Sequence, residues 1–345
     1  MSLLNSIKTS SLILSFLSFV FLFSCEDKKS GETVEQADKK TVKEEAKVNV
    51  PDFNADSAYK YIKDQVDFGP RVPNSDEHKA CAKYLEAKLK SWGAKTYVQN
   101  FEATAFDGTV LTSFNIVGSV NPTAKKRILL GSHWDSRPFA DQEEDHDEQR
   151  KPIDGANDGA SGVGVLMEIV RTIQAASEKP NVGVDVILFD SEDYGAPEFH
   201  TGNSSANFWC LGSQYWAKNK HIPGYRAFYG ILLDMVGAKD ATFFKEGVSM
   251  NYAPSIVRKV WTKGQKLGHA NHFVDKSCPG ITDDHTFVNQ MTGIPMIDII
   301  QYNHENEEQF FGEYWHTHDD TIDVIDKETL DAVGETVLHV LYEEK

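Results

Sequence analysis

Apolar residues follow two patterns along this chain, one typical of buried strands and one typical of helices. Three runs are apolar almost throughout, at residues 127–132, 184–189 and 229–233, as in strands that are covered on both faces. After the first run, apolar residues between Val163 and Ile173 recur at helical spacing. This alternation predicts an α/β fold, with a single domain built on a central mixed, mostly parallel β-sheet flanked by helices on both faces.

Weaker signals extend this prediction along the rest of the chain. Further strand-like runs occur at 96–101, 114–120 and 295–300. Helical spacing begins near Ala58, resumes after a capping Asn74 or Ser75, and returns in a last helix that Asp326 can cap.

The N-terminus carries a pattern typical of a targeting segment. Lys8 precedes an apolar stretch, 12–23, that is short for a membrane span, and the following Ser24-Cys25 completes a pattern that resembles the lipobox of bacterial lipoproteins. We therefore expect an exported protein that is lipid-anchored to a bacterial membrane, on its periplasmic or cell-surface side. An uncleaved anchor or an ordinary signal peptide is the alternative. The predicted parts are a lipoprotein signal peptide (1–24), a disordered tether (25–51) that begins at the lipidated Cys25, and a catalytic domain (52–345).

Charge and cysteine content narrow the class of protein. With 52 acidic against 35 basic side chains, the net charge of −17 argues against a nucleic-acid partner. Beyond Cys25, the cysteines Cys81, Cys210 and Cys278 show no zinc-binding spacing. We expect buried free thiols, although export would permit one disulfide.

Polar side chains follow each of the three apolar runs. They are His133 and Asp135 after the first, Glu192 and Asp193 after the second, and Asp234 after the third. Ligands bind beyond the carboxyl ends of the strands in open α/β sheets, so this set predicts a functional site at that edge.

Several motifs together resemble one known superfamily. They are Gly131-Ser132-His133-Trp134-Asp135, Asn157-Asp158-Gly159-Ala160-Ser161-Gly162, Asp190-Ser191-Glu192-Asp193, Asp234-Met235-Val236-Gly237, Asp283-Asp284-His285 and Trp315-His316-Thr317. From about Phe68 to the C-terminus the chain resembles the zinc aminopeptidase and glutaminyl cyclase superfamily, and within it the glutaminyl cyclases.

The resemblance implies one zinc ion per chain. Its ligands would be Asp158, Asp193 and His316, with a fourth position open for substrate. The family usually has Glu at the position of Asp193, so this ligand is one methylene shorter here. In the peptidases of the superfamily a second metal ion would use His133, Asp158 and Asp234, which are all present, so the number of metal ions stays open.

Asp283 favours a cyclase over a peptidase, because the peptidases typically carry a small neutral residue there. By the resemblance, Asp234 and Asp283 share a hydrogen bond and hold the leaving amide, and Ile281, Phe311 and Trp315 line the pocket. Trp209 would form a second aromatic wall, although the segment before it is longer than in animal-type cyclases. The alternative is that Asp283 is a helix N-cap and the three apolar residues belong to the core.

The implied reaction closes the N-terminal glutamine of a peptide or protein to pyroglutamate and releases ammonia. Zinc would polarise the γ-carboxamide, and Glu192 would carry the proton from the amine to the leaving group. We expect a monomer that acts on such peptides. A two-zinc aminopeptidase and a non-catalytic binding lipoprotein are the other interpretations.

Two remaining features have no assigned role. The segment 141–150 is rich in acidic residues and is predicted to be a solvated loop, with calcium binding as the alternative. Arg137 would contact either a substrate or this acidic loop.

Overall fold

The computed structural model describes residues 48–202, 204–303 and 309–345. The predicted signal peptide, Cys25 and most of the predicted tether lie outside these residues. Within the described ranges, no helix has both the length and the apolar character that a membrane crossing requires.

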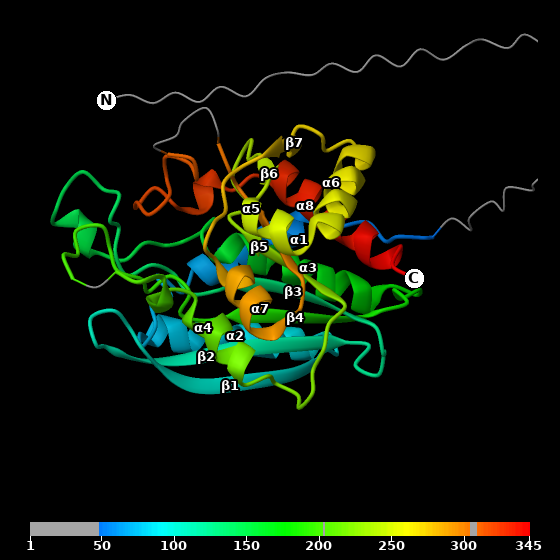
Figure 1. The fold of residues 1–345 in the computed structure, drawn as a ribbon, viewed down its shortest axis with the longest axis horizontal. Helices are drawn as coiled ribbons and strands as arrows, with labels where there is room; N and C mark the ends of the chain where they lie inside the picture. The colour runs from blue at the N-terminus through cyan, green and yellow to red at the C-terminus, as the bar shows by residue number, and fades with distance from the viewer. Residues whose placement is uncertain (1–47, 203, 304–308) are drawn as a thin grey trace, which may run out of the picture. The chain divides into compact units, whose positions relative to one another are not determined.

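A mixed sheet forms the centre of the described domain (Figure 1). Its strands in spatial order are β1 (Lys95–Thr104), β2 (Val110–Val120), β4 (Gly183–Phe189), β3 (Arg127–His133), β5 (Tyr229–Asp234) and β8 (Met296–Ile300). The β1–β2 and β2–β4 pairs are antiparallel, and the other three pairs are parallel. The prediction of a mixed, mostly parallel sheet is confirmed.

Helices cover both faces because the central strands are apolar at successive positions, and successive side chains point to opposite faces of the sheet. Ile128 and Leu130 of β3 pack into a core that includes residues of α1 (Ala55–Val66), α2 (Asp76–Ser91), α3 (Ala160–Ala175), α6 (Pro254–Leu267) and α8 (Lys327–Tyr342). Leu129 points to the other face, where it joins Trp216 of α4 (Leu211–Lys218) and Val288 of α7 (Asp284–Thr292). The continuous apolar runs are therefore explained by burial on two sides.

Smaller elements complete the described domain. They are α5 (Gly247–Tyr252), the two-stranded sheet of β6 (Phe243–Lys245) and β7 (Phe273–Ser277), and the 3-10 helices Glu148–Arg150, Ala206–Phe208 and Ile322–Val324. Of the two predicted caps for α2, Ser75 is the one used, since its side chain accepts from the His78 N–H. Asp326 caps α8 as predicted.

The three cysteines after Cys25 are free and buried in this domain. This confirms the expectation of unpaired thiols for Cys81, Cys210 and Cys278.

Candidate active site

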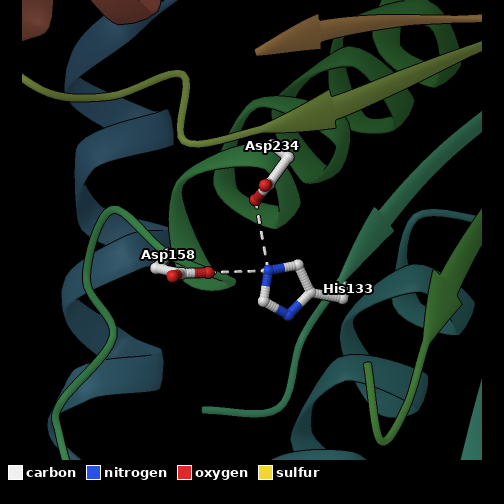
Figure 2. Close-up of side chains that lie close together, drawn as sticks. All are labelled: His133, Asp158 and Asp234. Carbon is white, nitrogen blue, oxygen red and sulfur yellow. Dashed lines mark hydrogen bonds and ion pairs between the residues drawn. The ribbon is translucent and has the colours of Figure 1, made fainter. Parts of the chain in front are cut away.

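Two buried histidines lie at one end of the parallel strands, each beside two carboxylates. His133, the last residue of β3, places Nε2 3.0 Å from Oδ1 of Asp158 and 3.1 Å from Oδ1 of Asp234, which ends β5 (Figure 2). His316 places its Nε2 3.5 Å from Asp193 and 3.6 Å from the other oxygen of Asp158. Asp158 is therefore shared by both groups, with one oxygen toward each histidine.

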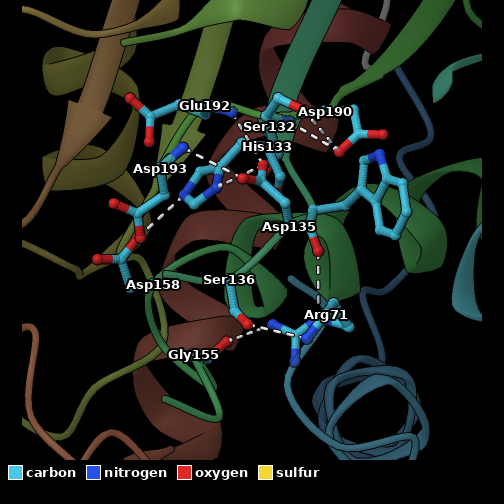
Figure 3. A network of polar contacts seen from close by, with 12 residues as sticks. Arg71, Ser132, His133, Asp135, Ser136, Gly155, Asp158, Asp190, Glu192 and Asp193 are labelled. Carbon is cyan, nitrogen blue, oxygen red and sulfur yellow. Dashed lines mark hydrogen bonds and ion pairs between the residues drawn. The ribbon is translucent and has the colours of Figure 1, made fainter. Parts of the chain in front are cut away.

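Asp135 fixes the backbone that carries Glu192 and Asp193. Its two carboxylate oxygens accept hydrogen bonds from the backbone N–H groups of these residues, each at 3.1 Å (Figure 3). One fully buried side chain thus sets the direction in which both adjacent carboxyls leave the end of β4.

The loop before Asp158 is held in place from two sides. The buried Arg71 donates to the carbonyls of Asp154 and Gly155 at 2.6 and 2.8 Å. Asp320 accepts from the backbone N–H groups of Asn157 and Asp158 at 2.7 and 3.0 Å. The Asp320 contacts join segments that are more than 160 residues apart in sequence.

Unusual backbone conformations are concentrated around the same end of the sheet. Ser191, Met235 and His316 have φ between 47° and 57°, a left-handed region that such residues rarely occupy. Gly159, at φ 96°, is required, because a Cβ there would lie 2.5 Å from the Asp135 carbonyl. The backbone is strained at the positions that aim the polar side chains.

One pocket of about 80 Å³ contains all the residues implied for the catalytic groups, the single zinc ion and the substrate-covering walls. These are Asp158, Glu192, Asp193, Trp209, Asp234, Ile281, Asp283, Phe311, Trp315 and His316. Met235, Thr282 and Ile300 also line it and were not predicted. A cavity needs at least ~10–15 Å³ to hold one water molecule. The pocket is several times larger, which is enough for a group the size of one side chain.

The apolar wall of the pocket is built from stacked rings. Trp315 lies against His316 with ring centroids 3.7 Å apart, and Phe311 packs edge-on against Trp315 at 5.1 Å. The Trp209 ring is also parallel to the His316 ring, with ring centroids 6.4 Å apart. Two aromatic walls therefore border the polar end of the pocket.

Burial changes the proton affinity of the pocket carboxyls. Burial raises the pKa of Glu192 well above its usual range, and the carboxyls of Asp193 and Asp283 raise it further. Burial also raises the pKa of Asp234 to about 7, in spite of its hydrogen bond with His133, and repulsion from Asp283 contributes. Some of these groups therefore hold protons near neutral pH.

Asp283 has the position of a helix N-cap as well as that of a pocket residue. Its side chain accepts from the Asp284 N–H at the start of α7. Its other oxygen, Oδ2, is buried without a hydrogen-bond partner among the described residues. Asp234 and Asp283 are close enough for their charges to repel, but no hydrogen bond joins them in the described part of the chain. Asp283 both caps α7 and lines the pocket, so its two interpretations are compatible.

The donor atoms fit a divalent metal ion of the zinc type. Each histidine group combines one imidazole nitrogen with two carboxylate oxygens whose donor atoms lie within 4.8 Å of one another. Asp193 leaves Oδ2 buried and without a hydrogen-bond partner in the described part of the chain. A cation held by Asp158, Asp193 and His316 would offset the negative charge of these buried acids.

Glu246 supports the pocket segment that contains Ile281 and Asp283. Its carboxylate caps α5 by accepting from the Ser249 N–H at 2.7 Å, and it also accepts from the Ile281 N–H at 2.8 Å and contacts Nε2 of His285 at 3.1 Å. The sequence offered no signal for this role, because Glu246 lies in no motif and its partners Ile281 and His285 are 35 and 39 residues away.

Acid is expected to weaken the domain through Glu246. Burial would raise the pKa of this carboxyl, but the hydrogen bond and charge of His285 outweigh that effect and lower the pKa to about 2. The resulting stabilisation is present above pH ~4.5 and is lost as the pH falls toward 2. Urea unfolding of Glu246→Gln should show a free energy lower than wild type by about 2 kcal/mol at pH 6, with the difference shrinking toward pH 2. A difference that is constant with pH would contradict this role.

Three residues near the pocket had no predicted role in catalysis or zinc binding. Asp141 was predicted to be in a solvated loop, which is wrong, because it is buried and paired with Arg137. Arg137 contacts the acidic segment, which is one of the two contacts predicted for it. Cys210 donates its thiol to Glu192 at 3.1 Å. No local pattern identifies these contacts, since they depend on how separate loops meet.

Comparison with known proteins agrees with this geometry. Residues 115–341 match the model of peptidase family M28, so the chain belongs to that family. It is 26% identical to the glutaminyl-peptide cyclotransferase of Bos taurus over 252 residues, which are 64% of this chain and 63% of the bovine protein.

Solved structures are more similar still. A glutaminyl cyclase from Bacteroides thetaiotaomicron, crystallised with N-acetylhistamine, is 52% identical with a TM-score of 0.83, covering 86% of this chain and all of that one (100%). A Zn-dependent exopeptidase from Parabacteroides distasonis is 53% identical with the same TM-score of 0.83, the same 86% of this chain and 100% of its own. The resemblance to the zinc aminopeptidase and glutaminyl cyclase superfamily is confirmed, and so is the predicted fold.

Proposed function

We propose that this protein is a glutaminyl-peptide cyclotransferase, which converts the N-terminal glutamine of a peptide or protein to pyroglutamate and releases ammonia. The observation that carries the proposal is the pocket itself. It unites Glu192, Asp234 and Asp283 with a metal-competent triad in a space that accepts one side chain. Its similarity to a bacterial glutaminyl cyclase at 52% identity supports the same activity.

Asp158, Asp193 and His316 would hold one zinc ion. When bound there, zinc supplies a Lewis acid for the carboxamide oxygen of the substrate. The coordination set has three protein ligands, which is typical of catalytic rather than structural zinc.

Glu192 has the position and environment of a general acid and base. As a carboxylate it takes one proton from the α-amine nitrogen of the substrate as that nitrogen bonds to the γ-carbon of the same residue. The carboxylic acid formed in this way returns the proton to the departing nitrogen, so ammonia leaves and no water is consumed. Its raised pKa brings the proton affinity nearer to neutrality, where such transfer is efficient.

The other pocket residues position the substrate and exclude water. A carboxyl of Asp234 or Asp283 that holds a proton can donate to the leaving amide, while one that is ionised can accept from its N–H. Ile281, Phe311 and Trp315 cover the side chain as it folds back on its own amine. Ring closure within one residue gains mainly from this orientation.

A two-metal aminopeptidase is the second candidate function, and one observation favours it. The two oxygens of Asp158 are directed at His133 and His316 separately, the arrangement that a bridging carboxylate needs. Family membership and the exopeptidase relative are compatible with either activity.

A product-mass assay separates the candidates. Purified, zinc-loaded protein is incubated with a peptide that begins with glutamine and with the same peptide that begins with leucine. A cyclotransferase removes one ammonia from the first and leaves the second intact. Release of a free amino acid from either peptide would support the aminopeptidase. If the mass of both peptides is unchanged, the protein is a non-catalytic binding protein.

We also propose that the protein is exported, attached to a membrane by a lipid on Cys25, and monomeric. The sequence of residues 1–51 supports export and lipid attachment. In the native host, Cys25→Ser should move the protein from the membrane fraction to the soluble fraction, with Cys81→Ser as the matched control that stays membrane-bound. Retention of Cys25→Ser in the membrane would favour an uncleaved anchor.

A further inference from the structure

Arg137 is a buried arginine at the back of the candidate metal site. Only 1% of its surface is exposed, so each of its contacts is made in an environment shielded from water. Its Nε and Nη2 atoms donate to the two oxygens of Asp141, both at 2.7 Å. This two-pronged geometry fixes the plane of the guanidinium group as well as its position.

The third nitrogen of Arg137 is directed at a predicted zinc ligand. Nη1 donates to the backbone carbonyl of Asp193 at 3.1 Å and to its Oδ1 at 3.2 Å. The other carboxylate oxygen, Oδ2, is the buried atom that has no hydrogen-bond partner in the described ranges. Arg137 therefore holds the same oxygen of Asp193 that lies 3.5 Å from Nε2 of His316, and so fixes the carboxylate relative to the other predicted ligand.

Asp141 extends the same arrangement to a second predicted ligand. Its Oδ1 lies 3.1 Å from Nδ1 of His316. Asp141 therefore lies on the Nδ1 side of the ring, while Nε2 faces Asp158 and Asp193 and is the nitrogen available to a metal ion.

Trp209 lies over the same guanidinium group. The Arg137 Cζ atom is 4.8 Å from the centre of the Trp209 ring, within the range of a cation–π contact. Trp209 is also parallel to the His316 ring. The arginine thus connects one wall of the pocket with the two metal-binding side chains.

We propose that Arg137 and Asp141 form a positioning pair, which sets the ligand geometry of Asp193 and His316 and so determines the zinc affinity of the site. The pair compensates for the short reach of Asp193, because it holds both the backbone and the carboxylate of that residue. This inference depends on the zinc site of the proposed function but not on which reaction the site catalyses.

The test is a direct titration of zinc into metal-free protein in competition with a chromophoric chelator. Lysine at position 137 keeps the charge but cannot form the two-pronged contact with Asp141 and reach Asp193 at once. Arg137→Lys is expected to weaken zinc binding by about 10- to 100-fold, the usual effect of losing a partner that orients a ligand. Asp141→Asn should weaken it by a similar factor and provides a second, independent variant if Arg137→Lys does not fold.

The chain offers a matched control in Arg127, at the opposite end of β3. It makes an equivalent two-pronged contact with Asp185, with both distances 2.6 Å. Arg127→Lys should lower the melting temperature but leave zinc affinity at the wild-type value. Equal zinc affinities in Arg137→Lys, Asp141→Asn and Arg127→Lys would overturn the proposal. Failure of the wild-type protein to bind zinc would instead overturn the proposed function.

Discussion

Glu192→Gln is expected to lower the rate of pyroglutamate formation by at least ~100-fold while zinc binding is unchanged. Proton transfer by a positioned side chain typically contributes 10²–10⁴-fold, and glutamine cannot take up or release a proton at neutral pH. The variant should fold, because glutamine has nearly the same shape and the Glu192 backbone N–H remains bonded to Asp135. The loss should therefore be confined to the chemical step.

The measurement is ammonia release at saturating substrate, together with zinc content and melting temperature for the same preparation. Glu102→Gln, an exposed position on β1, is the matched control and should keep full activity. If Glu192→Gln retains wild-type turnover with its metal, another group carries the proton and the proposed mechanism is wrong.

The strand ends were predictable from sequence because one physical rule brings them together. Parallel strands that are buried on both faces show as continuous apolar runs, and their carboxyl ends meet at one edge of the sheet. His133, Asp193 and Asp234 were found in this way. His133 contacts Asp234, and Asp193 lines the same pocket as Asp234. Asp158, Asp283 and His316 needed the resemblance to a family, because the loops that carry them follow no periodic pattern.

The supporting contacts could not be predicted for the same reason. The Asp320 side chain binds the backbone at Asn157, and Glu246 binds the backbone at Ile281, across 163 and 35 positions of the sequence. A single acidic residue in a loop has no local feature that separates such a role from exposure to solvent. The acidic segment after Arg137 illustrates the difficulty, since Asp141 is buried while several of its neighbours are exposed.

The short helix α4 was not predicted from the sequence, for a different reason. α4 begins at Leu211 and is preceded by Cys210, whose φ of 54° is unfavourable for this residue and is imposed by tertiary contacts. Its backbone N–H donates to the carbonyl of Glu192 at 2.9 Å. The helix start is therefore determined by the active-site loop rather than by a capping signal in its own sequence.

His316→Ala is expected to abolish zinc binding, with a loss of affinity greater than ~100-fold. The imidazole is the only nitrogen donor of the triad it forms with Asp158 and Asp193, and removing it leaves two carboxylates that repel one another in a buried pocket. Zinc should consequently no longer raise the melting temperature of the variant, although it does so for the wild-type protein. Both effects can be followed by chelator competition and by thermal unfolding with and without zinc.

His133→Ala is the matched comparison, because His133 has the same kind of environment in the other triad. It contacts Asp158 and Asp234 at 3.0 and 3.1 Å, and it shares Asp158 with His316. If one zinc ion is bound by Asp158, Asp193 and His316, His133→Ala should still bind one equivalent with nearly wild-type affinity. Wild-type protein that binds two equivalents, with His133→Ala losing one of them, would instead establish a pair of metal ions bridged by Asp158. That result would favour the aminopeptidase, because a metal ion held by Asp234 would prevent this carboxyl from donating a proton to the leaving amide.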